Sequence, residues 1–125
     1  MNWSLSPIQN TAAVCLLGCA VLLSACTSNK APEAKKYQTL EEATTALNTE
    51  SNKIDLYIAE LGQAKTEADK KHIACEKIPQ QYDLMLAIVE ANQHLMTGED
   101  QKVQAQFKQM ALEQKARFTR SLWCK

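Results

Sequence analysis

The sequence predicts an all-α domain, a small bundle of three or four helices that is stapled by one disulfide and preceded by an apolar leader. Three observations support this fold class. Apolar residues between positions 40 and 122 recur at the spacing of helix faces, three, four or seven residues apart. The sequence contains no strand-like alternation and no Asn-Gly or Asp-Gly hairpin turn. Only three glycines and three prolines occur in 125 residues, so few positions interrupt a helix.

The leader comprises the first 25 residues and carries no charged side chain. No Lys, Arg, Asp, Glu or His occurs between Met1 and Ala25. Its apolar run, 12–25, is shorter than the roughly 20 residues that span a bilayer as a helix. Such a run at an N-terminus is typical of the core of a signal peptide. A buried core helix is the alternative, but it does not explain the abrupt change to polar sequence after Cys26.

The leader ends in the sequence LSAC at positions 23–26, which resembles the lipobox of bacterial lipoproteins. The resemblance implies that residues 1–25 are removed and that Cys26 becomes a lipidated N-terminus. Three acyl chains would then hold the protein firmly, because each buried CH₂ contributes about 0.8 kcal/mol. The sequence LLGC ending at Cys19 also fits, but cleavage there would leave an apolar stretch on the mature chain. Thr27 stands where Asp would favour retention in the inner membrane, so the resemblance implies the outer membrane. We expect the domain to face the periplasm, although the sequence leaves a surface orientation open.

All charged residues follow the leader, and they balance. The 14 Lys and Arg residues equal the 14 Asp and Glu residues, so the net charge is zero. A nucleic-acid partner is not expected, because such proteins carry a basic excess or stripe. The balance also argues against a strong overall attraction to acidic lipid surfaces.

Cysteine usage predicts one disulfide. Cys15 and Cys19 leave with the leader and Cys26 is consumed by lipid, which leaves Cys75 and Cys124. An even pair in an oxidising compartment favours a bridge between them. It would close a loop of about 50 residues and contribute roughly 4 kcal/mol through chain entropy. Two free thiols are the alternative, and no metal site is expected because the His-x-x-Cys pattern that ends at Cys75 has no second half.

The mature chain divides into a tether and a helical domain. Residues 26–38 are polar and are expected to form a flexible tether to the lipid, and residues 39–125 the domain. Thr39 and Glu42 fit a capping box at the start of the first helix. Apolar residues then recur every seven positions, at Leu40, Leu47, Ile54 and Leu61. A second series, three residues further along, is also apolar except at Glu50. This seam predicts packing against another helix, and we favour a bundle over an intermolecular coiled coil.

The most apolar part of the mature chain predicts a central helix. Thr66 is expected to start a short charged helix that ends at Ile78, because a residue before proline is pushed out of helical geometry. Pro79 would then open the central helix. Gly98 is expected to cap its C-terminus. The helix carries two apolar stripes, which together indicate burial on two sides: Tyr82, Met85, Leu86, Val89 and Met96, and Leu84, Ile88, Ala91 and Leu95.

A last helix is expected to open at Glu99 and Asp100, where the helix dipole favours negative charge. Apolar residues from Val103 to Leu122 continue at helical spacing. The predicted bridge would staple the last residues to the start of the central helix. Trp123, beside Cys124, either packs beneath the bridge or stays exposed as an anchor, and we favour packing.

No catalytic constellation is present in the sequence. His72 and His94 lie in unrelated contexts, and neither accompanies a nucleophile motif, a phosphate loop or a metal-ligand pair. We therefore expect no enzyme activity and no cofactor. Binding is the remaining class of function. Met85, Met96 and Met110 are adaptable apolar side chains that can line a groove for a partner helix, although for each one taken singly we favour ordinary core.

The layout from Leu40 to Cys124 resembles the pilotins of type II secretion systems. The features that carry the resemblance are the sequence CEKIP at positions 75–79, the long apolar helix after it and the late second cysteine. Pilotins are small outer-membrane lipoproteins with an all-α domain and an internal disulfide. The resemblance implies a chaperone-like role, in which the domain binds a disordered C-terminal segment of the secretin as a helix and the lipid carries it to the outer membrane.

Other functions stay open. Lys125 and the heptads loosely resemble the major outer-membrane lipoprotein, whose terminal Lys is joined to peptidoglycan, so a structural tether is one alternative. An inhibitor or exclusion lipoprotein that acts on an incoming enzyme or conjugation machine is another. An envelope scaffold without a defined partner is a further possibility.

Overall fold

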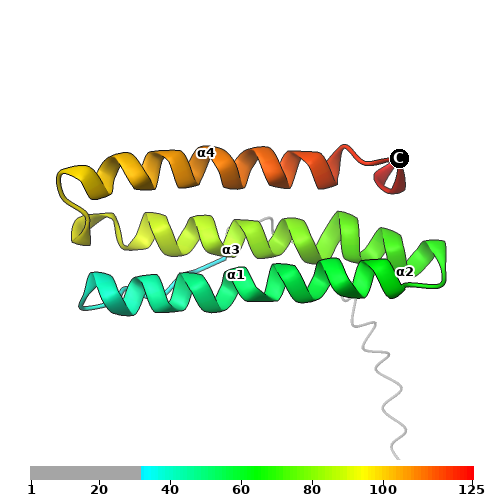
Figure 1. Cartoon of the computed structure of the whole chain (residues 1–125), viewed down its shortest axis with the longest axis horizontal. Coiled ribbons are helices and arrows are strands. Elements are labelled where there is room, and N and C mark those ends of the chain that lie inside the picture. Colours follow the sequence, from blue (N-terminus) through cyan, green and yellow to red (C-terminus); the bar gives the residue numbers. More distant parts are fainter. Residues whose placement is uncertain (1–31) are drawn as a thin grey trace, which may run out of the picture.

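Three long helices run side by side in the computed structural model, which describes residues 32–125 (Figure 1). Within this range the chain forms helices and turns and no strand. The predicted all-α class is therefore confirmed. The leader, both lipobox sequences and the first part of the expected tether lie outside the described residues. The helices are α1 (Leu40–Gln63), α2 (Glu67–His72), α3 (Ile78–Ala91) and α4 (Glu99–Thr119), and a π-turn (Ile73–Lys77) joins α2 directly to α3.

α1 begins where its capping signal predicts. Thr39 has an extended backbone, and its Oγ1 accepts the backbone N–H of Glu42 at 3.2 Å. The Glu42 carboxylate accepts a bond in return, at 3.0 Å, but from the N–H of Gln38. In the standard capping box this bond comes from the cap residue itself.

The predicted helix boundary at Ile78 is wrong. Thr66 caps α2 as predicted, with its Oγ1 accepting the N–H of Asp69 at 3.0 Å. The chain then remains helical through Ile78, whose N–H bonds to the carbonyl of Ile73, five residues back. A π-turn is wider than an α-turn, and this relieves the clash of the Pro79 ring with the preceding turn. The proline is therefore accommodated inside one continuous helical row.

Gly98 does not cap α3 as expected. α3 ends earlier, at Ala91, and a 3₁₀ turn over Gln93–Leu95 follows it. Gly98 has a φ of 55° and lies immediately before α4. Side chains disfavour this backbone conformation, so the glycine serves the turn into α4. α4 then opens at Glu99, as predicted.

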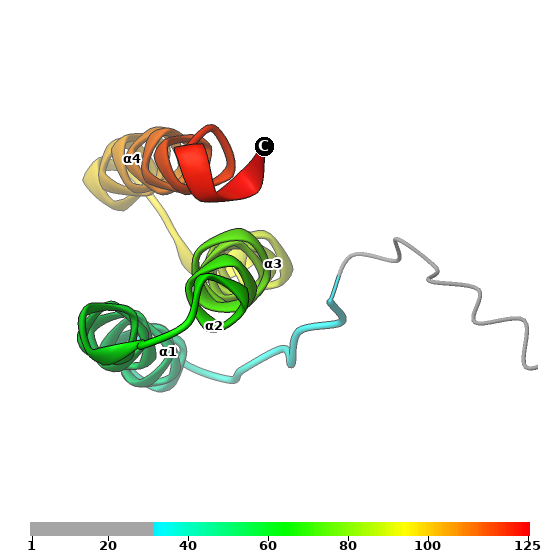
Figure 2. The same ribbon diagram turned by 90° about the vertical axis from the view of Figure 1, so that its right-hand side faces the viewer.

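α3 is the central helix, as its two apolar stripes predict. Viewed end-on, α1 and α4 lie on the same side of α3 and apart from each other (Figure 2). Both make their main packing contacts with α3. The core lies along this junction and consists of Ile54, Ile73, Ile78, Tyr82, Met85 and Ala111. The three helices therefore form an open V in cross-section.

The disulfide joins Cys75, in the π-turn, to Cys124 after α4, with 5.5 Å between the two Cα atoms. It holds a C-terminal 3₁₀ turn, Leu122–Cys124, beside α2 and the π-turn. The predicted pairing, and its place at the start of the central helix, are confirmed. Trp123 stays 40% exposed, so its expected packing holds only in part.

Residues 32–38 have no regular secondary structure, yet their last part is fixed to the domain. The N–H of Tyr37 donates to Oδ1 of Asn92 at 2.7 Å. Nδ2 of Asn92 donates to the carbonyls of Lys35, at 3.0 Å, and Ile88, at 2.8 Å. The described part of the tether runs from the start of α1 past α3, to the side opposite the opening between α1 and α4 (Figure 2).

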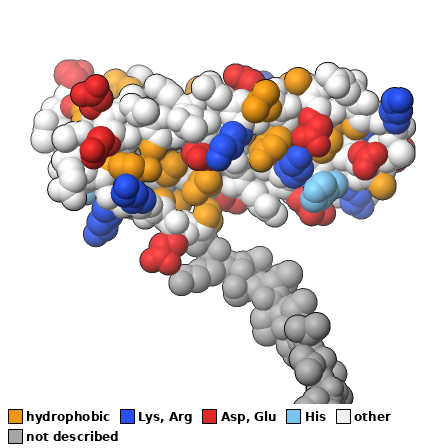
Figure 3. All heavy atoms as spheres, turned by 90° about the horizontal axis from the view of Figure 1, so that it is seen from below, with side chains coloured by type: hydrophobic (Ala, Val, Ile, Leu, Met, Phe, Trp, Pro, Cys, Tyr) orange, Lys and Arg blue, Asp and Glu red, His pale blue; other side chains and the backbone are white. Residues whose placement is uncertain are grey.

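The outer side of α1 carries a mixed surface. Acidic and basic side chains are interspersed there, and a patch of apolar side chains lies near the point where the tether leaves (Figure 3). Among residues 32–125, no helix is both long enough and apolar enough to cross a membrane.

Candidate functional site

The main candidate site is a groove between α1 and α4, with α3 as its floor. A hollow of about 210 Å³ marks the end of this groove near the α3–α4 turn. Most of the side chains around it are apolar. We call the feature the α1–α4 groove, and the residues that line its hollow are Leu40, Thr44, Leu47, Val89, Met96, Asp100, Val103, Gln104 and Phe107.

Helical spacing explains how the same helices build both the core and the groove. α1 buries Ala43 and Ile54 against α3. The neighbouring stripe of α1 recurs at intervals of four and three residues and lines the groove with Leu40, Thr44 and Leu47. On α4, Ala111 is buried, and Val103 and Phe107 line the groove beside it. Each helix therefore buries one stripe and presents the next stripe to the groove.

Apolar side chains continue beyond the hollow along both walls. On α4, Val103 is 63% exposed, and Met110, seven residues later on the same stripe, is 49% exposed. On α1, Ile58 lies eleven residues after Leu47 and is 45% exposed. A partner that covered these side chains would recover roughly 25 cal/mol for each Å² of apolar surface removed from water.

Polar groups interrupt the apolar stripes halfway along the groove. Tyr82, on the floor, is buried, and burial is the main cause that raises the pKa of its hydroxyl. The Asp55 carboxylate adds to this rise in pKa, and Asp55 lies eleven residues after Thr44, on the stripe of α1 that lines the groove. Within the described chain, Asp55 and Asp100 have no ion-pair partner. The groove therefore combines an apolar end with unpaired negative charge.

Partly buried polar contacts around Glu50 fix α1 to the floor of the groove. Nε2 of the buried Gln81 donates to the backbone carbonyl of Glu50 at 3.0 Å and to its carboxylate at 2.7 Å. Nζ of Lys53 donates to the same carboxylate at 2.8 and 2.9 Å. This second interaction is the largest cause that lowers the pKa of Glu50. Glu50, the polar residue in the heptad pattern of α1, therefore makes a contact between α1 and α3.

α4 is held to the floor in a different way. Ala111 is the only residue of α4 that is buried. Two ion pairs with α3, Lys108 with Glu90 and Lys115 with Asp83, lie on the side of α4 away from the groove. The disulfide then ties the chain after α4 to the π-turn. Phe107 and Phe118 add partly buried contacts with the core, so this wall has less fully buried packing than α1 and adds ion pairs and a covalent bond.

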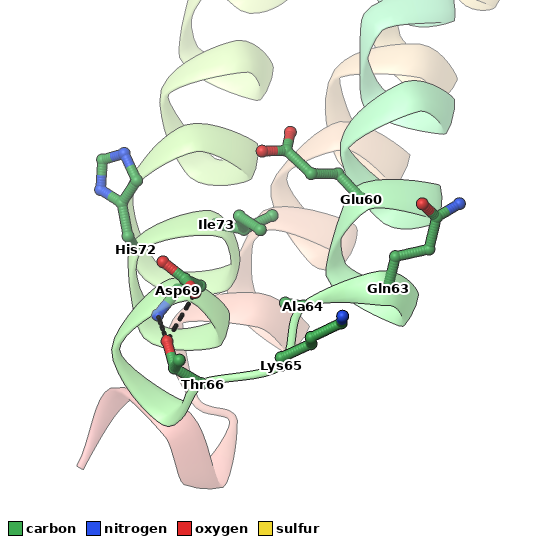
Figure 4. Close-up of a pocket in the computed structure, with 8 residues that line it drawn as sticks. All are labelled: Glu60, Gln63, Ala64, Lys65, Thr66, Asp69, His72 and Ile73. Atoms are coloured by element: carbon green, nitrogen blue, oxygen red, sulfur yellow. Dashed lines mark hydrogen bonds between the residues drawn. The ribbon is translucent and has the colours of Figure 1, made fainter.

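A second hollow lies at the turn between α1 and α2, and Glu60, Thr66, Asp69 and His72 in its lining already have partners (Figure 4). The Asp69 carboxylate accepts a bond from Oγ1 of Thr66 at 2.6 Å. Nδ1 of His72 lies 3.0 Å from the Glu76 carboxylate, and Nζ of Lys77 lies 2.6 Å from the carboxylate of Glu60. His72 projects from the outer side of α2, away from Glu60 (Figure 4). These groups do not converge on one point as catalytic residues would.

The structure separates several residues that the sequence singles out. His72 lies on α2, whereas His94 lies in the 3₁₀ turn after α3. Within residues 32–125, no group of three or more His, Cys, Asp or Glu side chains is placed to hold a metal ion. Met96 lines the groove, Met85 is buried in the core and Met110 is exposed. Sequence reasoning missed Asn92, whose tether contacts have no local signal.

No family model, characterised protein or solved structure matches this chain. The resemblances to bacterial lipoproteins and to pilotins therefore rest on the residues quoted for them. The groove and its contacts carry the functional argument.

Proposed function

We propose that this protein is a lipid-anchored binding module of the bacterial envelope, which takes an amphipathic helix of a protein partner into the α1–α4 groove. One observation carries the proposal: two helix walls and a buried apolar floor leave apolar rims that no described segment of the chain covers. Helix-in-groove recognition uses such a surface, with apolar anchors of the partner at intervals of three and four residues.

The V-shaped arrangement presents two helices of the same direction to one partner. α1 and α4 run in the same direction and α3 runs back between them (Figures 1 and 2). A helix that rests on both walls would complete a four-helix bundle, the arrangement in which amphipathic helices bury their apolar faces. The apolar stripe of α1 from Leu40 to Ile58 is about 27 Å long at 1.5 Å per residue. A partner helix of roughly 18 residues would match this length.

The groove also favours a particular charge pattern in the partner. Asp55 and Asp100 supply unpaired negative charge at its middle and at one end. A partner helix with apolar anchors for the hollow and a Lys or Arg facing Asp55 would satisfy both parts of the groove. An acidic helix would bring like charges together and would be rejected.

We propose further that Cys26 carries the lipid and that the partner is a secretin subunit. The sequence LSAC and the resemblance to pilotins support this assignment. In this function the groove shields an exposed segment of the secretin, and the lipid takes the complex to the outer membrane. The described tether runs to the side opposite the groove, so an anchor there leaves the groove accessible.

Two variants of α4 test the groove directly. Val103→Asp places a charge inside the groove, whereas Leu112→Asp places the same charge outside it. Both side chains are more than half exposed, at 63% and 54%, so neither change should disturb the core. In-cell crosslinking and pull-down, with an epitope inserted within residues 27–31, should capture the secretin with the wild type and with Leu112→Asp. Val103→Asp should lose it. If all three proteins capture the secretin, or if only the wild type does, the assignment of the α1–α4 groove as the binding site is refuted.

The lipid site has its own matched pair of variants. Cys26→Ser should abolish incorporation of a labelled fatty acid and should leave the leader attached, as intact mass will show. Cys19→Ser should be labelled and cleaved like the wild type. The opposite result would place the lipid on Cys19. A wild-type protein that incorporates no labelled fatty acid would refute the lipoprotein assignment.

A peptidoglycan tether is the rival function, because Lys125 is exposed and has no ion-pair partner within residues 32–125. Digestion of peptidoglycan should leave the protein unchanged in size on a denaturing gel. If digestion changes the size of the wild type but not of the Lys125→Ala variant, the peptidoglycan tether is the function instead.

A further inference from the structure

One end of the molecule combines exposed apolar side chains with unpaired cations. Leu122 is 83% exposed and Trp123 is 40% exposed. Both lie in the 3₁₀ turn Leu122–Cys124, which the disulfide holds against the π-turn. The fold therefore fixes both side chains in place on the surface. We call residues 117–125 the C-terminal tip.

The cations of the tip lack partners. Arg117, Arg120 and Lys125 form no ion pair and no side-chain hydrogen bond within residues 32–125. Elsewhere most lysines are paired with carboxylates: Lys53, Lys70, Lys77, Lys102, Lys108 and Lys115. The two arginines line a shallow hollow on α4 together with Glu113. That carboxylate accepts a bond from Gln109 at 3.0 Å and pairs with neither arginine.

The helix beside the tip does not cancel this charge. α2 packs next to the Leu122–Cys124 turn. Its Glu67 is paired with Lys70, and its Asp69 carboxylate accepts a bond from Oγ1 of Thr66. Lys71, also on α2, is exposed and has no partner in the described chain. At this end of the described chain, the cations without an ion pair (Lys71, Arg117, Arg120 and Lys125) therefore outnumber the side-chain carboxylates without one (Asp69 and Glu113), although the chain as a whole is neutral.

We propose that the C-terminal tip docks on the surface of an anionic lipid bilayer. Tryptophan favours the membrane interface, where its ring is covered and its N–H stays hydrated. Leu122 would enter beside it, and the arginines would face the lipid phosphates, because the negative surface potential attracts cations within about 10 Å. Exposed apolar and aromatic side chains next to cations are the pattern of interfacial membrane binding.

The length of the tether is compatible with this contact. The chain is pinned to the domain at Tyr37 by Asn92. About 25 Å of helix separates Asn92 from Cys75, and Cys124 is bonded to Cys75. The chain from Cys26 to Tyr37 spans up to about 38 Å when extended. Under the proposed function, in which Cys26 carries the lipid, the anchor and the tip can therefore reach the same membrane surface.

Trp123 is a built-in reporter for the test. The only other tryptophan is Trp3, in the leader, so the full chain with Trp3→Phe reports on Trp123 alone when it is excited at the red edge of the spectrum, where tyrosine does not absorb. The protein is added to phosphatidylcholine vesicles with and without phosphatidylglycerol, each with and without brominated lipid as a quencher. We expect a blue shift and quenching of Trp123 on the anionic vesicles and little change on the neutral ones. The apolar leader can bind vesicles of either kind, so the readout is the environment of Trp123 and not binding itself.

Two double variants isolate the cations. Arg117→Gln with Arg120→Gln should lower the docking equilibrium about fivefold per cation removed, and so abolish most of the quenching. Lys36→Gln with Lys102→Gln changes the net charge equally at exposed positions away from the tip and should retain the quenching. Circular dichroism should show the same fold for all proteins.

Three results would overturn the proposal. They are equal quenching on neutral and anionic vesicles, no change in Trp123 on either, and equal loss with both double variants. If the wild type captures no partner through the groove, or if Cys26 is not labelled with fatty acid, the proposed function is refuted. Neither result changes the outcome of the vesicle experiment. The two proposals can therefore fail separately.

Discussion

α1 and α4 rest on the same helix, yet they are attached by different means. α1 buries Ala43 and Ile54 against α3 and adds the partly buried contact between Glu50 and Gln81. α4 buries only Ala111 fully, packs Phe107 and Phe118 against the core at partly buried positions, and adds two ion pairs with α3 and the disulfide beyond its end. One wall of the groove is therefore attached mainly by core packing, and the other by less burial supplemented by charge and a covalent bond.

The difference shows how a small domain keeps a binding surface open. A helix whose apolar residues all faced the core would close the groove, whereas α4 leaves Val103 and Met110 in water. The burial that α4 gives up must be replaced, because a domain of this size has little surplus core. The disulfide supplies that replacement, and α4 is the wall that we expect to adjust to a partner.

Loss of the disulfide should have the largest effect. Cys75→Ser with Cys124→Ser should lower the free energy of unfolding by about 4 kcal/mol, since it frees a loop of about 50 residues in the unfolded chain. Denaturant unfolding measures the loss, and hydrogen exchange locates it. Backbone amides of α4 should exchange faster than in the wild type, with much less change in α1. Equal acceleration in both helices would show that their attachment does not differ as described.

Truncation of the α1 core should come next. Ile54→Ala should lower the free energy of unfolding by about 3 kcal/mol, because the removed atoms are buried and leave a cavity. Ile58→Ala, at a position that is 45% exposed, is the control and should change it by about 0.5 kcal/mol or less. Thermal or urea unfolding distinguishes the two variants, and similar losses would contradict the assignment of α1 to the packed side.

The tether contact should have an intermediate effect. Asn92→Ala should cost about 2 kcal/mol, because it leaves the N–H of Tyr37 and two carbonyls without their partner. It should also release the tether, so that trypsin cleaves faster after Lys35 and Lys36. Asn48→Ala, on the exposed side of α1, should change neither stability nor cleavage. An unchanged cleavage rate with Asn92→Ala would mean that other contacts hold the tether.

Acid should weaken the α1 side through Glu50. Chiefly because Lys53 donates to its carboxylate, the pKa of Glu50 lies below its ordinary value of 4.5. A lowered pKa in the folded state means that the ionised carboxylate stabilises the fold above about pH 4.5, and that this contribution is lost as the pH falls through the folded pKa. Glu50→Gln should therefore flatten the acid limb of the stability curve in urea titrations. Glu90→Gln should flatten it less, because Glu90, whose pKa Lys108 lowers, is exposed. A larger effect at Glu90 would reverse the comparison.

The ion pairs of α4 should show the smallest effect. Lys108→Ala and Lys115→Ala should each cost about 0.5 kcal/mol, because solvent screens partly exposed pairs. The cost should shrink further at high salt. Double-mutant cycles with Glu90 and Asp83, at low and high salt, measure it. Coupling well above this value that is insensitive to salt would make the ion pairs, and not the disulfide, the main attachment of α4.

The starts of the helices were predictable from sequence because capping is local. Thr39, Thr66 and Glu99 each act through bonds or charges within one turn. The bridge between Cys75 and Cys124 was predictable from the cysteine count and the expected compartment. These features follow from residue type and spacing alone.

The errors come from positions where the rest of the fold decides. The expected boundary at Ile78 follows a sound local rule, but a π-turn absorbs the proline within one continuous helical row. Asn92 bonds to residues more than 50 positions away, and no local pattern announces such a contact. The heptads of α1 predicted a partner helix, but spacing alone could not show that α4 would leave one side of the seam open.

The contact of the tether with Asn92 also decides how the domain bears a load. A pull on residues 32–37 acts on Asn92 through its hydrogen bonds. Asn92 lines a small hollow beside the groove together with Val89 and Met96. Only one turn of α3 would therefore lie between the tether contact and a partner helix that is bound over Val89. The covalent chain also carries this pull from Tyr37 into α1, so load enters the groove end of α1 and α3, and the disulfide lies about 25 Å away at the other end of the helix row.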